Sequence, residues 1–178
     1  GTPGMYRSPS ISPDGRWLAA TGHPQVRDGN HDVWLFALEG ESAIRFTIEP
    51  SEDVDAAWAP DGKALFYAAN AKGPHDVFRK SVDGTRAAEL VYEAPGMQKP
   101  ASVSRDGKFL LVNSEVAERN VILVVDLARG RIRLNVELKY NRDDPALAGK
   151  VIDLLRTEGV LDQCVLTSLE YSAVREAK

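Results

Sequence analysis

Residues 12–19 read S-P-D-G-R-W-L-A, and this stretch decides the fold because it returns twice along the chain. It recurs as A-P-D-G-K-A-L-F from Ala59 and as S-R-D-G-K-F-L-L from Ser104. The intervals between copies are 47 and 45 residues, measured between the aspartates Asp14, Asp61 and Asp106. Asp-Gly between two apolar runs is a strong hairpin signal, because glycine readily takes the left-handed backbone angles of a tight turn. The three aspartates are therefore predicted to build turns.

A second landmark recurs together with the first. It reads H-D-V-W-L-F from His31, H-D-V-F-R-K from His75 and R-N-V-I-L-V from Arg119, at two intervals of 44 residues. Two landmarks that return together with a period near 45 residues match the length of one four-stranded propeller blade. Because both His-Asp pairs fall at the same point of this repeat, they are predicted to have a structural role.

Apolar runs between the landmarks supply the predicted strands of three units. These strands cover residues 8–13, 17–21, 32–38 and 43–48, then 54–59, 64–69, 76–82 and 87–93, and finally 100–104, 109–114 and 120–127. The acidic residues Glu52, Asp53 and Asp55 between the first two units are expected in a solvated loop. The predicted fold class is mainly β, with three propeller-type four-stranded blades over residues 1–127.

The last third of the chain has a different pattern. The stretch L-N-V-E-L-K-Y at 134–140 alternates like a strand, and Q-C-V-L-T-S-L at 163–169 reads as a buried strand. Between them a helix is predicted to begin at Asp144, a good N-cap, and to stop at Gly159. A second helix is predicted to begin near Glu170. Residues 128–178 are therefore predicted to form a small α/β (βαβα) segment with a parallel strand pair.

Composition narrows the classes of function. The 178 residues are 43% hydrophobic and 27% charged with a net charge of −4, so a soluble globular protein without nonspecific nucleic-acid binding is expected. No apolar run is long enough to span a bilayer, and the opening G-T-P-G-M-Y-R lacks the apolar core of a signal peptide. The compartment stays open between bacterial periplasm and cytoplasm. The single cysteine, Cys164, is expected to be a buried structural thiol.

The repeated units resemble TolB-like β-propeller repeats over about residues 8–127, through S-P-D-G followed by an apolar strand and then D-V-W or D-V-F. Similar repeats occur in periplasmic translocation proteins, in sensor regions of bacterial kinases and in the propellers of prolyl-oligopeptidase-type peptidases. The resemblance implies a noncatalytic protein-interaction or ligand-sensing module without a cofactor, because such blades mainly make binding surfaces.

The tail resembles part of another family. The stretch A-R-G-R-I-R-L-N-V-E-L-K-Y-N, a helix and then D-Q-C-V-L-T-S-L, within about residues 124–178, are similar to the middle of a glycerophosphodiester phosphodiesterase (β/α)8 barrel. This resemblance implies that Glu137 ligates a divalent metal, Ca²⁺ or Mg²⁺, and that Lys139 is a catalytic residue placed to meet the phosphate. The alternative function is thus a metal-dependent hydrolase, incomplete in this chain because blades stand where the family has its histidine segments. The simpler interpretation of Glu137 and Lys139 is a charged pair on a strand face.

Three blades are too few to close a ring, since propellers have about four to eight. Blades missing from this chain, two copies pairing into a six-bladed ring, or the tail capping the open end would each resolve this. The expected partner is therefore a protein or a second copy of the chain. Because both resemblances overlap at residues 120–130, the chain is also interpreted as a fusion of two fragments, natural or artificial.

Overall fold

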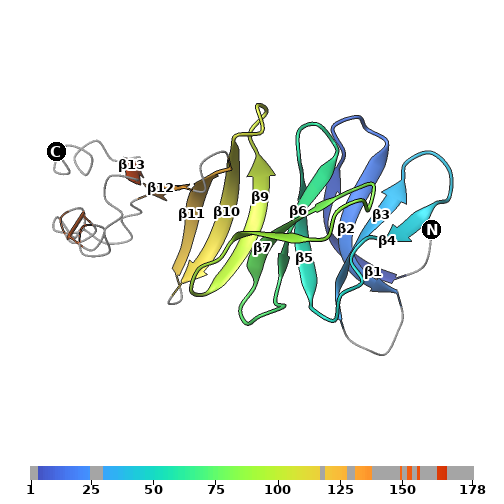
Figure 1. The fold of residues 1–178 in the computed structure, drawn as a ribbon, viewed down its shortest axis with the longest axis horizontal. Helices are drawn as coiled ribbons and strands as arrows, with labels where there is room; N and C mark the ends of the chain where they lie inside the picture. Colours follow the sequence, from blue (N-terminus) through green and yellow to red (C-terminus); the bar gives the residue numbers. More distant parts are fainter. Residues whose placement is uncertain are drawn as a thin grey trace.

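The structure, a computed structural model, describes residues 4–24, 30–116, 119–127, 131–137 and 164–167 together with positions 149, 152, 153 and 156. The described strands form three sheets (Figure 1). Blade 1 contains β1 (Gly4–Ile11), β2 (Trp17–Pro24), β3 (Asp32–Ala37) and β4 (Ala43–Arg45). Blade 2 contains β5 (Asp53–Trp58), β6 (Ala64–Ala69), β7 (Asp76–Ser81) and β8 (Glu89–Tyr92). Blade 3 contains β9 (Met97–Val103), β10 (Phe109–Val116), β11 (Arg119–Asp126) and β12 (Arg131–Glu137), with β13 (Cys164–Thr167) beside β12.

Within each blade, successive strands pair antiparallel in chain order. Every strand predicted in the three units is present, with boundaries that differ from the prediction by a few residues. The described residues between positions 4 and 127 contain no helix. The mainly β fold class is therefore confirmed.

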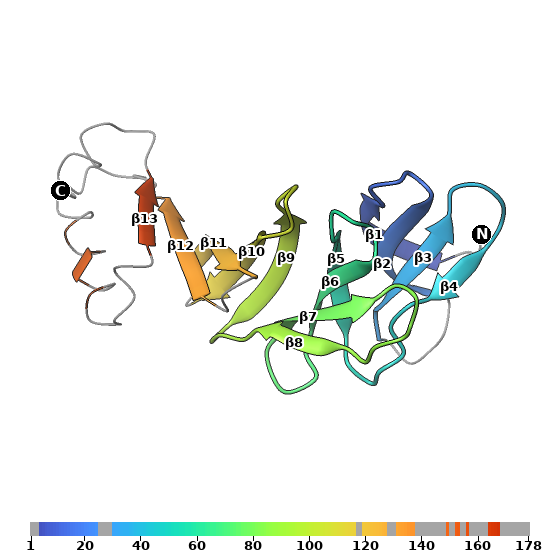
Figure 2. The same ribbon diagram turned by 45° about the horizontal axis from the view of Figure 1, so that its top comes forward.

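The first strand of each blade lies at one edge of its sheet, and the three edges meet. Strand β5 contacts both β1 and β9, so the inner strands of successive blades are neighbours. The sheets follow one another along the molecule as the blades of a propeller do (Figure 2). The line along which β1, β5 and β9 meet is called the axis below.

Two apolar clusters hold the blades together, and β6 contributes to both. Leu65, Tyr67 and Ala69 face the cluster between blades 1 and 2, whereas Ala64 and Phe66 face the cluster between blades 2 and 3. Because side chains alternate across a strand, this split is what a strand buried on both faces requires. All six residues of β6 are buried.

The Asp-Gly turns have the predicted chemistry. In blade 1 the Asp14 Oδ1 atom accepts the Arg16 backbone N–H at 3.1 Å, and the following glycine has φ of 70°. Asp61 and Asp106 accept the N–H two residues further on at 3.0 and 3.1 Å. The prediction that these aspartates build turns is therefore confirmed.

Strand β12 has two neighbours of opposite direction. It pairs antiparallel with β11 and parallel with β13, with Leu134 opposite Cys164. The predicted parallel strand pair is therefore present, and β12 also completes blade 3 as its fourth strand. Positions 149, 152, 153 and 156 are helical, and the rest of the two predicted helices lies outside the described residues. The complete βαβα segment stays a prediction, and no described helix is long and apolar enough to cross a membrane.

The two end blades each have one face that no described blade covers. In blade 1 the residues Val33 and Leu35 face blade 2, so the alternate residues Trp34 and Phe36 lie on the opposite face. In blade 3 the residues Leu110 and Val112 face blade 2, so Leu111 lies on the outer face with its paired neighbour Val124. Ile122 on the same face is 45% exposed.

Candidate functional site

Strands β1 and β5 each contain a β-bulge where they approach the axis. The register of β1 shifts between Arg7 and Ser10, and that of β5 shifts between Val54 and Ala57. Ser8 and Asp55, inside these two bulges, are the two non-glycine residues of the described chain with positive φ, at 51° and 53°. Strand β9 also has a register shift, opposite Leu111 and Val112. Bulges re-aim side chains and occur often beside functional sites.

Hydrogen bonds and an ion pair connect the three blades at the bulges. The Ser8 hydroxyl donates to Asp55 Oδ1 at 2.5 Å, and Lys99 Nζ lies 3.4 Å from Asp55 Oδ2. The Asp55 backbone N–H donates to the hydroxyl of buried Thr21 at 2.9 Å, which fixes the bulge of blade 2 against blade 1. Ser8, Asp55, Lys99 and Asn113 border a hollow of about 300 Å³. Ser8, Asp55 and Lys99 are called the axial site below.

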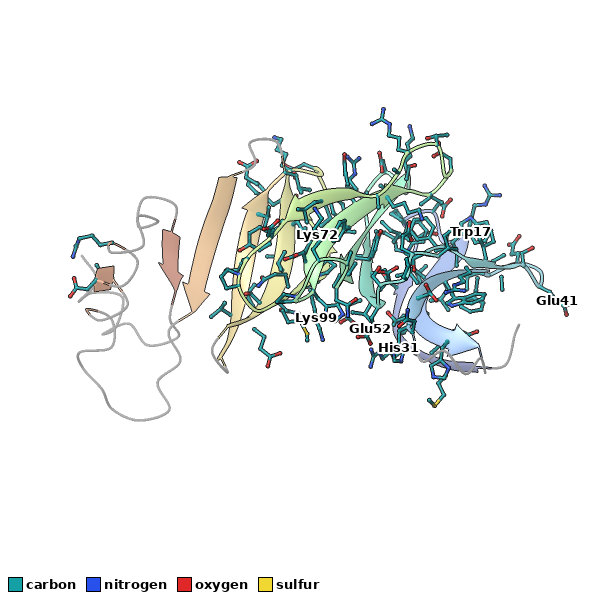
Figure 3. The ribbon with its side chains drawn as sticks, turned by 60° about the horizontal axis from the view of Figure 1, so that its bottom comes forward. Trp17, His31, Glu41, Glu52, Lys72 and Lys99 are labelled. Carbon is teal, nitrogen blue, oxygen red and sulfur yellow. The ribbon has the colours of Figure 1, made fainter. Side chains whose placement is uncertain are left out.

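A second polar group lies along the same edge of the blades. The His31 Nδ1 atom lies 2.9 Å from Glu52 Oε1, and His75 Nε2 lies 3.6 Å from Glu52 Oε2. The Arg7 guanidinium lies 3.8 Å from the same carboxylate. Figure 3 shows His31 and Glu52 beside each other, with Lys99 further along the edge. Burial lowers the pKa of His75, so this ring favours its neutral form.

The backbones of the two His-Asp pairs link each blade to the next. The His31 carbonyl accepts the N–H of Asp53, the first residue of β5, at 2.8 Å. The His75 carbonyl accepts the N–H of Gln98 in β9 at 2.7 Å. The same bond therefore recurs one period later, as the spacing of 44 residues requires. These backbone bonds support the predicted structural role of both pairs.

The expectation of a solvated loop is wrong for Asp53 and Asp55, whereas Glu52 lies in the connection before β5 with its side chain 33% exposed. Asp53 begins β5 and is completely buried, while Asp55 belongs to the axial site. The Asp53 Oδ1 atom accepts the Ser51 hydroxyl at 2.8 Å. Burial raises the pKa of Asp53 to about 6. The sequence prediction failed at these positions because several acidic residues close together resemble the composition of a surface turn.

Of the two residues predicted from the phosphodiesterase resemblance, the structure describes Glu137 alone. Glu137 is the last residue of β12 and pairs in register with Thr167 of β13, while Lys139 lies outside the described residues. Their functional assignment stays a prediction. Within the described ranges no three His, Cys, Asp or Glu side chains are arranged to hold a metal ion. The axial site was missed because Ser8, Asp55 and Lys99 carry no motif, although Ser8 and Asp55 are separated by one blade period.

Three radiating antiparallel blades with a polar axis define the class of protein as a β-propeller. The family profile described as the TolB beta propeller domain matches residues 1–174, and the chain belongs to this family. The matched region continues across the fusion point predicted at residues 120–130, and neither a fusion nor a phosphodiesterase-like segment gains support from the comparisons.

Solved structures with this fold include TolB proteins. The chain is 23% identical to TolB from Agrobacterium tumefaciens with a TM-score of 0.60, covering 72% of this chain and 45% of that one. It is 21% identical to TolB from Acinetobacter baumannii with a TM-score of 0.59, covering 72% and 32%. Identities at this level establish the fold and leave function to be argued from the site.

A curated relative is described as the uncharacterized peptidase YuxL of Bacillus subtilis. The identity is 25% over 175 residues, which cover 94% of this chain and 25% of the relative. The chain therefore spans about a quarter of that relative and less than half of the TolB proteins named above.

Proposed function

We propose that the chain is a noncatalytic binding module whose axial site recognises a protein partner. The observation that carries this proposal is the left-handed backbone of Ser8 and Asp55 at the axis. Such conformations cost of order 1–3 kcal/mol each and are concentrated at functional sites. The two bulges hold the Ser8 hydroxyl next to the Asp55 carboxylate at one mouth of the propeller. Lys99 adds an ammonium group to the same site.

The contacts of the axial site favour binding over catalysis. Serine nucleophiles are usually activated by a histidine, whereas the Ser8 hydroxyl donates to the Asp55 carboxylate. Both His31 and His75 face Glu52. The Bacillus relative is described as a peptidase, but this chain spans about a quarter of it, and a shared fold does not carry an activity with it.

Charge exchange at the axis tests this proposal. The immobilised chain is exposed to bacterial extract, and proteins retained by the wild type are identified by mass spectrometry. Asp55→Lys and Lys99→Asp are expected to lose the retained protein, and the double exchange, which restores an ion pair of reversed orientation, is expected to recover part of it. Arg16→Asp, on the exposed β1–β2 turn, is the matched control. Retention that none of the axial variants changes would refute the axial site.

A second part of the proposal concerns the open end faces. A second copy of the chain could complete a six-bladed ring by placing its blade 3 against the uncovered face of blade 1. The aromatic character of the blade 1 face and the aliphatic character of the blade 3 face support this pairing. The compartment where this happens is proposed to be the bacterial periplasm or cytoplasm.

The hydrolase is retained as a second candidate because of the parallel β12–β13 pair. Barrel active sites lie at the carboxyl ends of parallel strands, and Glu137 is at the carboxyl end of β12. The test is hydrolysis of bis(p-nitrophenyl) phosphate with Ca²⁺ or Mg²⁺, compared between wild type and Glu137→Gln. Turnover that the variant loses would support a metal-dependent hydrolase, whereas no turnover with either ion would eliminate this candidate.

A further inference from the structure

The interface between blades 2 and 3 contains a groove of about 690 Å³, within the size range of ligand sites. The Asp-Gly hairpins of both blades border it, and Pro60 lies close to Gly107 where they meet. It lies away from the axis, so it is independent of the axial site. Its apolar wall is made by Phe66, Val91, Val103 and Leu127.

Comparison of the repeats explains why the groove is open. One period earlier, the positions equivalent to Val103 and Arg79 hold Trp58 and Leu35, 7% and 2% exposed, in the core between blades 1 and 2. Val103 is much smaller than tryptophan, and Arg79 is 45% exposed in its side chain. Replacement of two core residues by a small one and a cation therefore opens space at the second interface.

The charges around the groove leave cations unpaired. A second hollow of about 250 Å³ shares Asp61, Arg79 and Glu89 with the groove and extends it along blade 2. Arg79 pairs with Glu89 at 3.2 Å and Lys108 pairs with Asp106 at 3.6 Å. The other two carboxylates, Asp61 and Asp83, accept backbone N–H groups of their own turns. Among the described residues, the side chains of Lys63, Arg86 and Arg105 in the two hollows have no ion pair.

We propose that this groove binds an extended acidic peptide segment with an apolar side chain between its carboxylates. The apolar side chain would pack on Phe66 and Val103, and the carboxylates would meet Arg105 at one end and Lys63 or Arg86 at the other. Arginine favours carboxylates because its planar fork can donate two parallel hydrogen bonds. The two hollows, of about 690 and 250 Å³, offer room for a segment of several residues and are too large for a single small anion to fill.

The test uses a fluorescein-labelled peptide of sequence Glu-Glu-Leu-Phe-Glu-Glu, titrated with the full chain by fluorescence anisotropy. Val103→Trp places in blade 3 the residue that blade 2 has at this point, and it is expected to weaken binding at least about tenfold by filling the groove. Arg105 is exposed, and Arg105→Glu is expected to weaken binding by about tenfold or more, since it removes a charge-assisted hydrogen bond and places a like charge beside the peptide. Lys72→Glu makes the same charge change on the β6–β7 loop, at the opposite end of blade 2, and should leave binding unchanged.

Three results would overturn the proposal. These are no saturable binding of the acidic peptide, equal binding of the control peptide Lys-Lys-Leu-Phe-Lys-Lys, and equal effects of Arg105→Glu and Lys72→Glu. Thermal unfolding of Val103→Trp is measured alongside, and if this variant does not fold, Arg105→Glu alone decides. Variants of Asp55 and Lys99 should bind the peptide normally, so failure here is distinguishable from failure of the axial proposal.

Discussion

Ser8 and Asp55 are one blade period apart in the sequence and share one hydrogen bond and one unusual backbone conformation. The Ser8 hydroxyl lies 2.5 Å from Asp55 Oδ1, and both residues have φ near +50°. Aspartate tolerates this region better than most residues because its short polar side chain can bond locally. The bulges therefore place a strained, bonded pair where blades 1 and 2 meet the axis.

The strain at Asp55 predicts an order of stabilities among its variants. Asp55→Asn should unfold within about 0.5–1 kcal/mol of the wild type, because asparagine adopts positive φ readily and keeps an acceptor for Ser8. Asp55→Gly also adopts positive φ readily but loses the bond from Ser8, so it should cost about 1.5–3 kcal/mol. Asp55→Val should cost about 2 kcal/mol or more, since a β-branched residue is poorly accommodated there. Urea denaturation measures all three free energies of unfolding. A valine variant as stable as the asparagine variant would show that the bulge relaxes without cost.

The Asp-Gly hairpins allow a matched set of three substitutions. In blades 1 and 3 a serine hydroxyl donates to the turn aspartate at 2.6 Å and accepts a backbone N–H at 2.9 Å, and blade 2 has Ala59 at this point. Ser12→Ala and Ser104→Ala are each expected to lower the free energy of unfolding by about 1 kcal/mol. Ala59→Ser should raise it by about 0.5–1 kcal/mol by creating the same bonds.

Chemical denaturation of the three turn variants under one set of conditions tests this prediction. The backbone bonds of the turn are present in all three blades, including the one from Gly62 N–H to the Ala59 carbonyl at 2.9 Å. The hydroxyl is therefore the principal difference between the hairpins. If Ala59→Ser lowers the free energy of unfolding, burial of the new hydroxyl destabilises the protein by more than its two hydrogen bonds stabilise it.

The buried carboxyl group of Asp53 should make the stability of the protein depend on pH. Its folded pKa is about 6, above the ordinary value of 3.8, so the folded state holds the proton more tightly than the unfolded state. The free energy of unfolding should therefore fall as pH rises from about 4 to about 6, by about 2–3 kcal/mol from this group. Asp53→Asn removes this contribution and should gain stability relative to wild type over the same range.

Urea denaturation of both proteins at pH 4, 5, 6 and 7 provides the comparison. The difference between variant and wild type isolates Asp53 from the other titrating groups, which both proteins share. A difference that stays constant across these pH values would place the folded pKa of Asp53 at its ordinary value.

The blades were predictable from sequence because turn chemistry and strand alternation are local. Asp-Gly signals such as Asp61-Gly62 fix the hairpins, and the apolar runs between them fix the strands. The axial site was not predictable in this way, because Lys99 and Asp55 meet only through the packing of different blades. Burial of Asp53 has the same origin, since its solvent is excluded by residues distant in the chain. The double pairing of β12 also depends on neighbours that sequence alternation does not identify.

The uncovered end faces predict association of two copies. Trp34 and Phe36 on blade 1, and Leu111 and Ile122 on blade 3, present apolar surface that a neighbouring blade would bury in a closed ring. Burial of apolar area contributes about 25 cal/mol per Å², so covering both faces at once favours a closed pair over a single contact. Sedimentation equilibrium at micromolar concentration should therefore give twice the mass of one chain.

Charged substitutions on the two end faces separate this association from nonspecific adhesion. Trp34→Glu and Ile122→Glu should each give the mass of one chain, because every contact of the ring contains one face of each kind. Ile48→Glu is the matched control, since Ile48 is 70% exposed on the connection between β4 and β5 and should leave the pair intact. A wild-type chain that sediments as a monomer at these concentrations would remove the second copy as the occupant of the end faces. Equal dissociation by all three variants would show that the association does not use the blade faces, since Ile48 lies outside them.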